Sequence, residues 1–436
     1  MQLMIVVFLV GYLAIALEHI IKINKAAIAI TMAAVIWTIY AFVAPADAES
    51  QIIVQMGEVT PIIVFLLGAM TIVEIVDLHG GFSIVPHFIK AKNKKRLLWI
   101  ISGITFIMSA ALDNMTSTII MVAIMSKIIA AREDRLWFAS AIVIAANSGG
   151  VWSPIGDVTT IMLWVKGNVT ADALIPHLIL PSLVSVMVPV AFMTRKLKGD
   201  EPVYKAEDDL EMGERIYPAI TRFDRILIVI IGVGGLISVP VFNAVTGLPP
   251  FMGVLMALAV LWLLTDIIYG KSNMAERQKL RIAKVLKKID APTIFFFFGI
   301  LIAVGALTES GLLGNVSTFL DEHIRNEYLI TGIIGVLSAI VDNVPLVAAA
   351  MGMYPMADPA MVEAGSYAAE FVQNGSFWEL LAYCAGTGGS LLIIGSVAGV
   401  VAMGAENIKF GWYLKRITFK AFIGYICGIV VYILMQ

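Results

Sequence analysis

Charge is scarce in this chain. Only 14% of its 436 residues are Asp, Glu, Lys or Arg, whereas a soluble domain carries about a quarter. Hydrophobic residues make up 59%, and the mean hydropathy is +0.90. This excludes an ordinary soluble domain, and a net charge of -2 without a long basic block gives no indication of a nucleic-acid partner. The length allows about ten membrane spans of roughly 20 residues each, so we expect a polytopic helical protein embedded in a lipid bilayer.

Cysteine is also rare. The chain has two, Cys384 and Cys427, which stand far apart in apolar runs and lack the spacing of a metal or redox motif. No nucleophile–base pair and no metal-ligand spacing stands out elsewhere in the sequence. We therefore expect a protein that is not an enzyme and uses no cofactor.

Long apolar runs divide the chain into membrane spans. Ten runs of spanning length cover residues 2–20, 26–44, 60–78, 136–165, 173–194, 223–242, 250–269, 292–309, 376–404 and 419–435. Two further runs, 96–131 and 327–356, are interrupted by an Asp-Asn pair without a hydrophilic loop. Such an interruption indicates a re-entrant hairpin whose tip lies at mid-depth, because polar backbone inside a bilayer must be surrounded by protein or water. We predict about ten full spans plus two hairpins.

The two halves of the chain repeat the same signals. The repeated positions are Pro61 and Pro292, Gly68 and Gly299, Ser109 and Ser338, Asp113-Asn114 and Asp342-Asn343, Gly149-Gly150 and Gly388-Gly389, and Gly156 and Gly395. An odd number of crossings in each half inverts the second relative to the first, which is the inverted-repeat architecture of secondary transporters. The predicted units are a first repeat at 1–195, a linker at 196–222 and a second repeat at 223–436. The first holds spans 1–3, a cytoplasmic-side hairpin at 96–131, a broken helix at 136–165 and a span ending at 194. The second holds a hairpin at 327–356 and a broken helix at 376–404.

Basic residues indicate the orientation. They gather in a few connections: Lys22 and Lys25, Lys90 to Arg96, Lys127 to Arg135, Arg195 to Lys198, Lys271 to Lys288, and Lys409 to Lys420. With ten crossings and two hairpins, all of these lie on one side, which the positive-inside rule assigns to the cytoplasm. We expect both termini outside and the central linker in the cytoplasm.

Polar residues inside the apolar runs are the candidate site, because an ionisable group within a bilayer is a functional hypothesis by default. Their oxygens suit Na⁺ or Li⁺, which prefer carboxylate, amide and hydroxyl ligands. The candidate ion ligands are Asp113, Asn114, Thr116, Asn147, Ser148, Ser153, Asp157, Thr159, Thr160, Ser338, Asp342, Asn343, Thr387 and Ser390, with Ser396 nearby. Sodium itself is placed at Asp113, Asn114, Asn147, Asp342 and Asn343. Alternatively, some of the hydroxyls bond only to the preceding helical turn.

Four carboxylates are candidates for proton coupling: Asp113, Asp157, Asp342 and Glu74. A carboxyl group in a poorly solvated site can hold either a proton or a sodium ion, because burial disfavours an uncompensated charge. Competition for one charge gives coupled exchange. For Glu74 the alternative is a charged helix end that reaches the interface.

The Asp-Asn tips, the stretch NSGGVWSPIGDVTT from Asn147 and the stretch GTGGSLLIIGS from Gly386 resemble the NhaD-type sodium/proton antiporters of the ion transporter superfamily. The resemblance runs through nearly the whole chain. It implies a homodimer in a bacterial inner membrane that exports Na⁺ or Li⁺ in exchange for H⁺. Related dicarboxylate symporters are similar in architecture but carry Ser-Asn-Thr at their tips, so the aspartates here favour the antiporter.

A sodium-coupled symporter of a dicarboxylate or another oxyanion remains the alternative. It requires an anion site, yet neither Asp-Asn tip nor either glycine break carries an Arg or Lys.

Overall fold

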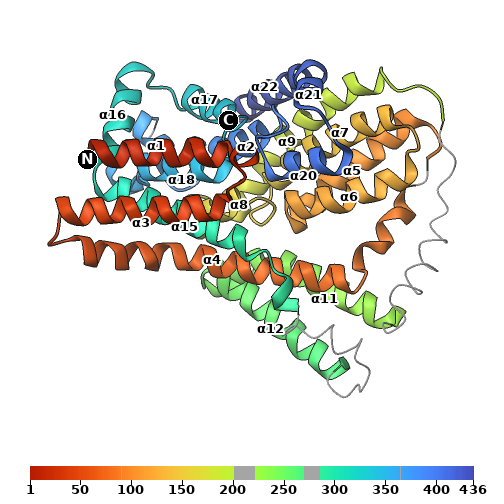
Figure 1. Ribbon diagram of the computed structural model, residues 1–436, viewed down its shortest axis with the longest axis horizontal. Helices are drawn as coiled ribbons and strands as arrows, with labels where there is room; N and C mark the ends of the chain where they lie inside the picture. Colours follow the sequence, from red (N-terminus) through yellow and green to blue (C-terminus); the bar gives the residue numbers. More distant parts are fainter. Residues whose placement is uncertain (90, 201–220, 270–284, 364) are drawn as a thin grey trace.

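The computed structural model spans residues 1–436 and describes all of them except 90, 201–220, 270–284 and 364 (Figure 1). The described residues are almost entirely helical, and the one β-bridge among them joins Asn93 to Asp200. Eight of the described helices are long and apolar enough to cross a membrane. The predicted class, a polytopic membrane protein built from helices, is confirmed.

The helices of the first half follow the predicted order. They are α1 (Gln2–Ala16), α2 (Glu18–Ile21), α3 (Lys25–Val43), α4 (Ala48–Leu78), the 3₁₀ helix η1 (Gly81–Phe88), α5 (Lys94–Leu112), α6 (Asn114–Ile128), α7 (Arg132–Gly150), α8 (Val158–Val165) and α9 (Ala171–Thr194). Helix α4 has 31 residues and begins well before residue 60, where the predicted span begins. A search for long apolar runs finds only the part of a helix that lies in lipid. It therefore misses the first turns of α4, which contain polar residues.

The second half also contains a helical hairpin and a broken helix. Its helices are α11 (Arg222–Thr246), α12 (Pro250–Tyr269), α15 (Ala291–Glu309), α16 (Leu312–His323), α17 (Glu327–Leu337), α18 (Asn343–Met353), α19 (Ser376–Gly388), α20 (Val397–Glu406), α21 (Phe410–Arg416) and α22 (Thr418–Met435), with short 3₁₀ turns η2 (Leu286–Lys288), η3 (Pro359–Met361) and η4 (Tyr367–Phe371). Helix α16 was not predicted. Its residues are a mixture of polar and apolar types, so a search for long apolar runs does not find it. Most of the predicted linker, residues 201–220, lies outside the described residues.

Each half contains the same contact between a hairpin and a broken helix. The hydroxyl of Ser109 in α5 donates to the carbonyl of Ala146 in α7 at 2.5 Å, and Ser338 donates to the carbonyl of Ala385 in α19 at 2.7 Å. Beside these bonds, Gly149 lies against the backbone of Phe106, and Gly388 lies against the backbone of Gly335. A side chain at either glycine would overlap that backbone, so the glycines allow the hairpin and the broken helix to touch.

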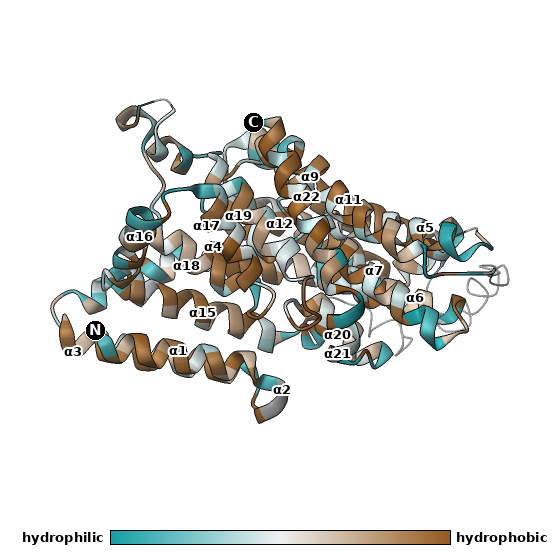
Figure 2. Cartoon of the chain, turned by 90° about the horizontal axis from the view of Figure 1, so that it is seen from above, coloured by the Kyte–Doolittle hydropathy of each residue, from teal (hydrophilic) through white to brown (hydrophobic). Residues whose placement is uncertain are grey.

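The hairpins approach from opposite ends of the molecule. In Figure 1, α5 and α6 lie toward the right end, and α17 and α18 lie toward the left. Helices α1, α3, α4 and α15 run alongside one another, with α11 and α12 packed on α4. Figure 2 shows hydrophilic residues gathered at the two ends, on α16 and on the loops beside α5 and α6. This arrangement brings both hairpin tips to the middle of the structure.

Candidate ion-binding site

The Asp157 carboxylate is the centre of a buried polar network. Asp157 follows the break between α7 and α8 and caps α8, where one of its oxygens accepts from the backbone N–H and the hydroxyl of Thr159, both at 2.9 Å. The amide of Asn114, at the tip of the first hairpin, donates to the other oxygen at 2.8 Å. The amide of Asn343, at the tip of the second hairpin, donates to both oxygens at 3.2 and 3.3 Å. Asp157 is 1% exposed, so both tips meet at one buried charge.

A second amide extends the network to the other broken helix. The Oδ1 atom of Asn147 accepts from Asn114 at 3.2 Å. Its Nδ2 atom donates to the hydroxyl oxygens of Ser390 at 2.9 Å and Ser396 at 2.8 Å, which lie at the break between α19 and α20. Four segments from the two halves therefore converge on a cluster of amide, hydroxyl and carboxylate oxygens.

Asp113 lies beside this network in an unusual backbone conformation. Its φ is 121° and its ψ is 161°, a region that is nearly exclusive to glycine and costs about 1–3 kcal/mol for other residues. Its carboxylate caps α6, accepting from the backbone N–H of Thr116 at 2.7 Å and from the Thr116 hydroxyl at 2.8 Å. Strain of this size persists only where the surrounding structure enforces it. The fold therefore fixes the orientation of the Asp113 carboxylate toward Thr116.

Asp342, the equivalent residue of the second tip, is held differently. Its φ is an ordinary -49°, and its only cap is a long 3.4 Å contact from the backbone N–H of Val344. The residue three positions further on is Pro345, which has neither the N–H nor the hydroxyl that Thr116 provides. The remaining carboxylate oxygen accepts from the ammonium of Lys25, the first residue of α3, at 3.3 Å.

Two cavities reach these aspartates from the same end of the molecule, where α3 and α15 begin, which we call the Lys25 end. One, of about 230 Å³, is lined by Asp113 together with Glu74 and Asp77 of α4. The other, of about 240 Å³, is lined by Asp342, Glu18 and Lys25. They share four lining residues: Met115, Asp290, Thr293 and Val397. The structure thus provides separate approaches to the two tips.

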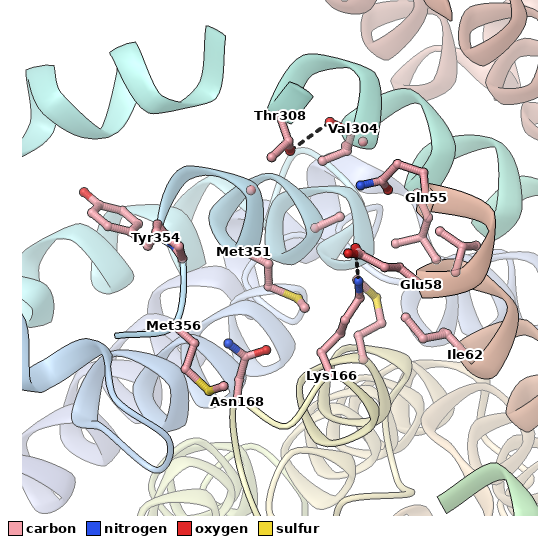
Figure 3. A pocket seen from close by; sticks show the side chains of 17 residues that line it. Gln55, Glu58, Ile62, Lys166, Asn168, Val304, Thr308, Met351, Tyr354 and Met356 are labelled. Carbon is pink, nitrogen blue, oxygen red and sulfur yellow. Dashed lines mark hydrogen bonds and ion pairs between the residues drawn. The ribbon is translucent and has the colours of Figure 1, made fainter. Parts of the chain in front are cut away.

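A third cavity, of about 300 Å³, lies toward the opposite end of α4 (Figure 3). Across it, the ammonium of Lys166 at the end of α8 pairs with the carboxylate of Glu58 in α4 at 2.5 Å. Met162, Thr308 and Met351 also line it. None of the candidate ion ligands is among its lining residues, so the site connects to the Lys25 end and not to this cavity.

Several predicted ligands bond elsewhere. Their partners are Ser185 for Ser148, the N–H of Ile155 for Ser153, the Asp157 carbonyl for Thr160, the Ala385 carbonyl for Ser338, and the Tyr383 carbonyl for Thr387. Thr160 and Thr387 bond to a carbonyl of the preceding turn, which is the alternative considered for the hydroxyls, whereas Ser148 and Ser338 bond to other helices. The network proper consists of Asn114, Asn147, Asp157, Thr159, Asn343, Ser390 and Ser396.

The network offers hard oxygen donors around a single carboxylate. Among the described residues, no three His, Cys, Asp or Glu side chains come together as a metal cluster. One negative charge surrounded by amides and hydroxyls suits a monovalent cation better than a divalent one, because a divalent ion would leave excess positive charge buried.

Sequence reasoning missed Lys25 and Asp290. Lys25 stands at the beginning of an apolar run, where a lysine ordinarily marks the membrane interface. Nothing in the sequence indicates a partner 317 positions away. Asp290 is its counterpart at the beginning of α15, where it caps the helix through Thr293 and lines both cavities at the Lys25 end.

Comparison with known proteins agrees with the predicted family. A model of the CitMHS family, described as citrate transporter, matches residues 12–369. Sodium/proton antiporter 1 of Arabidopsis thaliana is 44% identical over 435 residues, which cover 99% of this chain and 72% of the relative. Sodium/proton antiporter 2 of the same plant is 41% identical over 440 residues, covering 99% and 98%. The Na(+)/H(+) antiporter NhaD of Alkalimonas amylolytica is 30% identical over 464 residues, covering 98% and 89%.

The three relatives match 98–99% of the chain, and the family model matches it from residue 12 to residue 369, which includes both hairpins and the first broken helix. The chain therefore belongs to the CitMHS citrate transporter family of the ion transporter superfamily, together with these sodium/proton antiporters.

Proposed function

We propose that this chain is a secondary transporter that exchanges Na⁺ or Li⁺ for H⁺ by alternating access. One observation carries the proposal: Asn114 and Asn343, from opposite hairpins, both donate to the buried carboxylate of Asp157. The names of the relatives, sodium/proton antiporter and NhaD, support it.

The chemistry follows from one charge with two kinds of partner. When a cation binds, Asp157 supplies the negative charge, and the amides of Asn114, Asn147 and Asn343 turn their oxygens toward the ion. When a proton binds to the carboxylate instead, the same charge is neutralised and the cation leaves. Because a buried charge is unfavourable without a partner, the site holds one or the other, and this competition couples the two fluxes. Asp113, Asp342 and Glu74 line the approaches and are further candidates for carrying the proton.

The predicted topology gives the direction of access. Lys22, Arg132 and the other basic connections support a cytoplasmic assignment for the Lys25 end, with both termini outside and the central linker in the cytoplasm. We assign residues 1–195 and 223–436 to two inverted repeats joined by the linker at 196–222. The conformation described here is then open to the cytoplasm. A homodimer in a bacterial inner membrane is our expectation from the family resemblance, and the relatives reported above come from both a plant and Alkalimonas amylolytica.

The test uses everted membrane vesicles, whose cytoplasmic face is outward, and a pH-sensitive dye. After respiration acidifies the lumen, addition of Na⁺ or Li⁺ should restore dye fluorescence, whereas choline should not. Asp157→Asn removes the charge that the cation and the proton share, so its vesicles should respond like vesicles without the transporter. A full sodium response from Asp157→Asn at wild-type protein levels would reject the assignment of the site.

The second candidate is a sodium-coupled symporter of a dicarboxylate or tricarboxylate, which the family description favours. Lys25, the lysine that contacts a tip, is already neutralised by Asp342, so it is poorly placed to bind an anion. Uptake of labelled succinate or citrate that rises with sodium, together with an absent dye response, would favour the symporter.

A further inference from the structure

The ion pair between Lys25 and Asp342 joins parts of the protein that are distant in sequence and distinct in the fold. Lys25 begins α3, which packs along α15, whereas Asp342 stands at the tip of the second hairpin. The two side chains are only 21% and 15% exposed. The pair is thus more shielded from water than an ordinary surface ion pair.

Three further contacts hold the lysine in place. Its ammonium lies over the ring of Phe296 in α15, 4.3 Å from the ring centre, an arrangement in which an aromatic face attracts a cation. Its backbone N–H donates to the carboxylate of Glu18 at 3.1 Å, and the Asn24 side chain caps the helix that it begins. A cation in the first turn of a helix is electrostatically unfavourable, so compensating contacts are required there.

The surroundings of Asp342 leave it in need of a cation. Pro345 cannot cap it as Thr116 caps Asp113. Around the same cavity lie the carboxylates of Glu18 and Asp290, and of the described residues that line it, Lys25 alone is basic. The hydroxyl of Tyr12 in α1, within electrostatic range of Asp342, is buried and has no hydrogen-bond partner among the described residues. A single ammonium therefore balances this corner of the site.

We propose that the Lys25 ammonium is a tethered cation that occupies Asp342 in the cytoplasm-open conformation and competes there with the transported ion. A sodium ion that binds at Asp342 must displace the ammonium, which breaks the link between α3 and the second hairpin. Ion binding and release of the hairpin thereby become one event. This inference rests on the proposed exchange function and assigns Lys25 as a positioning residue that sets the apparent affinity for sodium at the cytoplasmic face.

The test measures initial rates of sodium-driven proton release in everted vesicles over a range of Na⁺ concentrations. Lys25→Gln removes the competitor, so the apparent KM for Na⁺ should fall about threefold or more. Lys25→Arg offers a forked, permanently charged partner that binds a carboxylate more firmly, so its KM should rise. Lys166→Gln, the matched control, removes another lysine that pairs with a distant helix but contacts no tip, and its KM should remain within about twofold of wild type.

Opposite shifts of KM in the two Lys25 variants support competition. If Lys25 is only structural, Lys25→Gln will lower kcat or protein yield with KM unchanged, and Lys25→Arg will restore the wild-type values; that outcome overturns the proposal. Should Lys25→Gln fold poorly, the rise in KM of Lys25→Arg decides the question by itself. A wild-type protein that releases no protons on addition of sodium rejects the exchange function instead, so the two failures are distinct.

Discussion

The two hairpin tips carry the same Asp-Asn pair but hold the aspartate in opposite ways. Asp113 is strained and doubly capped by Thr116, whereas Asp342 is relaxed, almost uncapped and paired with Lys25. The asparagines that follow, Asn114 and Asn343, have the same partner, because both donate to the carboxylate of Asp157. An internal repeat thus preserves the inner ligands and diverges one residue away. We infer that the shared asparagines serve ion binding and that the differing aspartates give the two approaches different tasks.

Removing either charge should have the largest effect. Asp113→Asn and Asp342→Asn should each reduce sodium-driven proton release by about 100-fold or more. Asp342 is one partner of a shielded charge pair, and Asp113 accepts two hydrogen bonds as a charged carboxylate, of about 1.5–3 kcal/mol each. The dye assay in everted vesicles measures this. Full activity in either variant would contradict the role of its tip.

The same pair of variants separates the tips by stability. Asp342→Asn leaves the Lys25 ammonium without its carboxylate, so the amount of folded protein should fall, and the double variant Lys25→Gln/Asp342→Asn should recover it without recovering exchange. Asp113→Asn has no such partner to repair among the described residues. Gel filtration of the fluorescently tagged protein in detergent measures the folded fraction.

Exchanging the caps should have the next largest effect. Thr116→Val deletes a hydroxyl bond to a carboxylate, a contact of about 1.5–3 kcal/mol, so the apparent KM for Na⁺ should rise about tenfold. Thr116→Ser keeps the hydroxyl and is the control. Pro345→Thr gives Asp342 the cap that it lacks and weakens its need for Lys25, so KM should shift in the opposite direction. Shifts of the same sign would show that the caps do not distinguish the tips.

Much of this arrangement could be predicted from sequence. Asp-Asn pairs and glycine pairs inside apolar runs located the hairpins, the breaks and most of the central network, including Asn114, Asn147 and Asp157. Polar residues are costly inside a bilayer, so their presence there indicates a functional role. The hydroxyls were less predictable. Thr387 and Ser390 are near neighbours, yet one bonds to the preceding turn and the other to Asn147. In the sequence, both hydroxyls follow backbone carbonyls to which they could donate. Their different partners result from the packing of α7 against α19, which the sequence does not reveal.

Long-range pairs and backbone strain could not be predicted. Lys25 has the appearance of an interfacial lysine at the beginning of a span. Asp113 has a positive φ and is the single residue between α5 and α6. Residues 338–342 separate α17 from α18, and Asp342 has an ordinary φ there. Identical residues in two repeats therefore do not ensure identical conformations.

Backbone strain gives a smaller and more specific test. At both tips the aspartate is a helix N-cap, where glycine is preferred over alanine. The free energy of unfolding of the Gly variant minus that of the Ala variant is measured at position 113 and again at position 342. The N-cap preference contributes to both differences, so it cancels when one is subtracted from the other. The remaining advantage of glycine at position 113 should be about 1–3 kcal/mol, the release of strain at its positive φ. Chemical unfolding in detergent micelles, followed by tryptophan fluorescence, measures the four variants, and equal Gly–Ala differences would contradict the strain.

The ion pair at the opposite end should matter least. Glu58 and Lys166 approach closely, but their side chains are 47% and 27% exposed, and exposed pairs contribute about 0–1 kcal/mol. Glu58→Gln should therefore change the rate of exchange by less than about twofold. The change in rate should be smaller still at high salt, because screening already weakens the pair. Lys25 and Lys166 both link helices far apart in the chain, so the contrast isolates what is particular to Lys25: its carboxylate partner belongs to a tip. A large loss in Glu58→Gln would instead mean that closure of the opposite end limits the cycle, and the asymmetry between the two tips would then be of secondary importance for the rate.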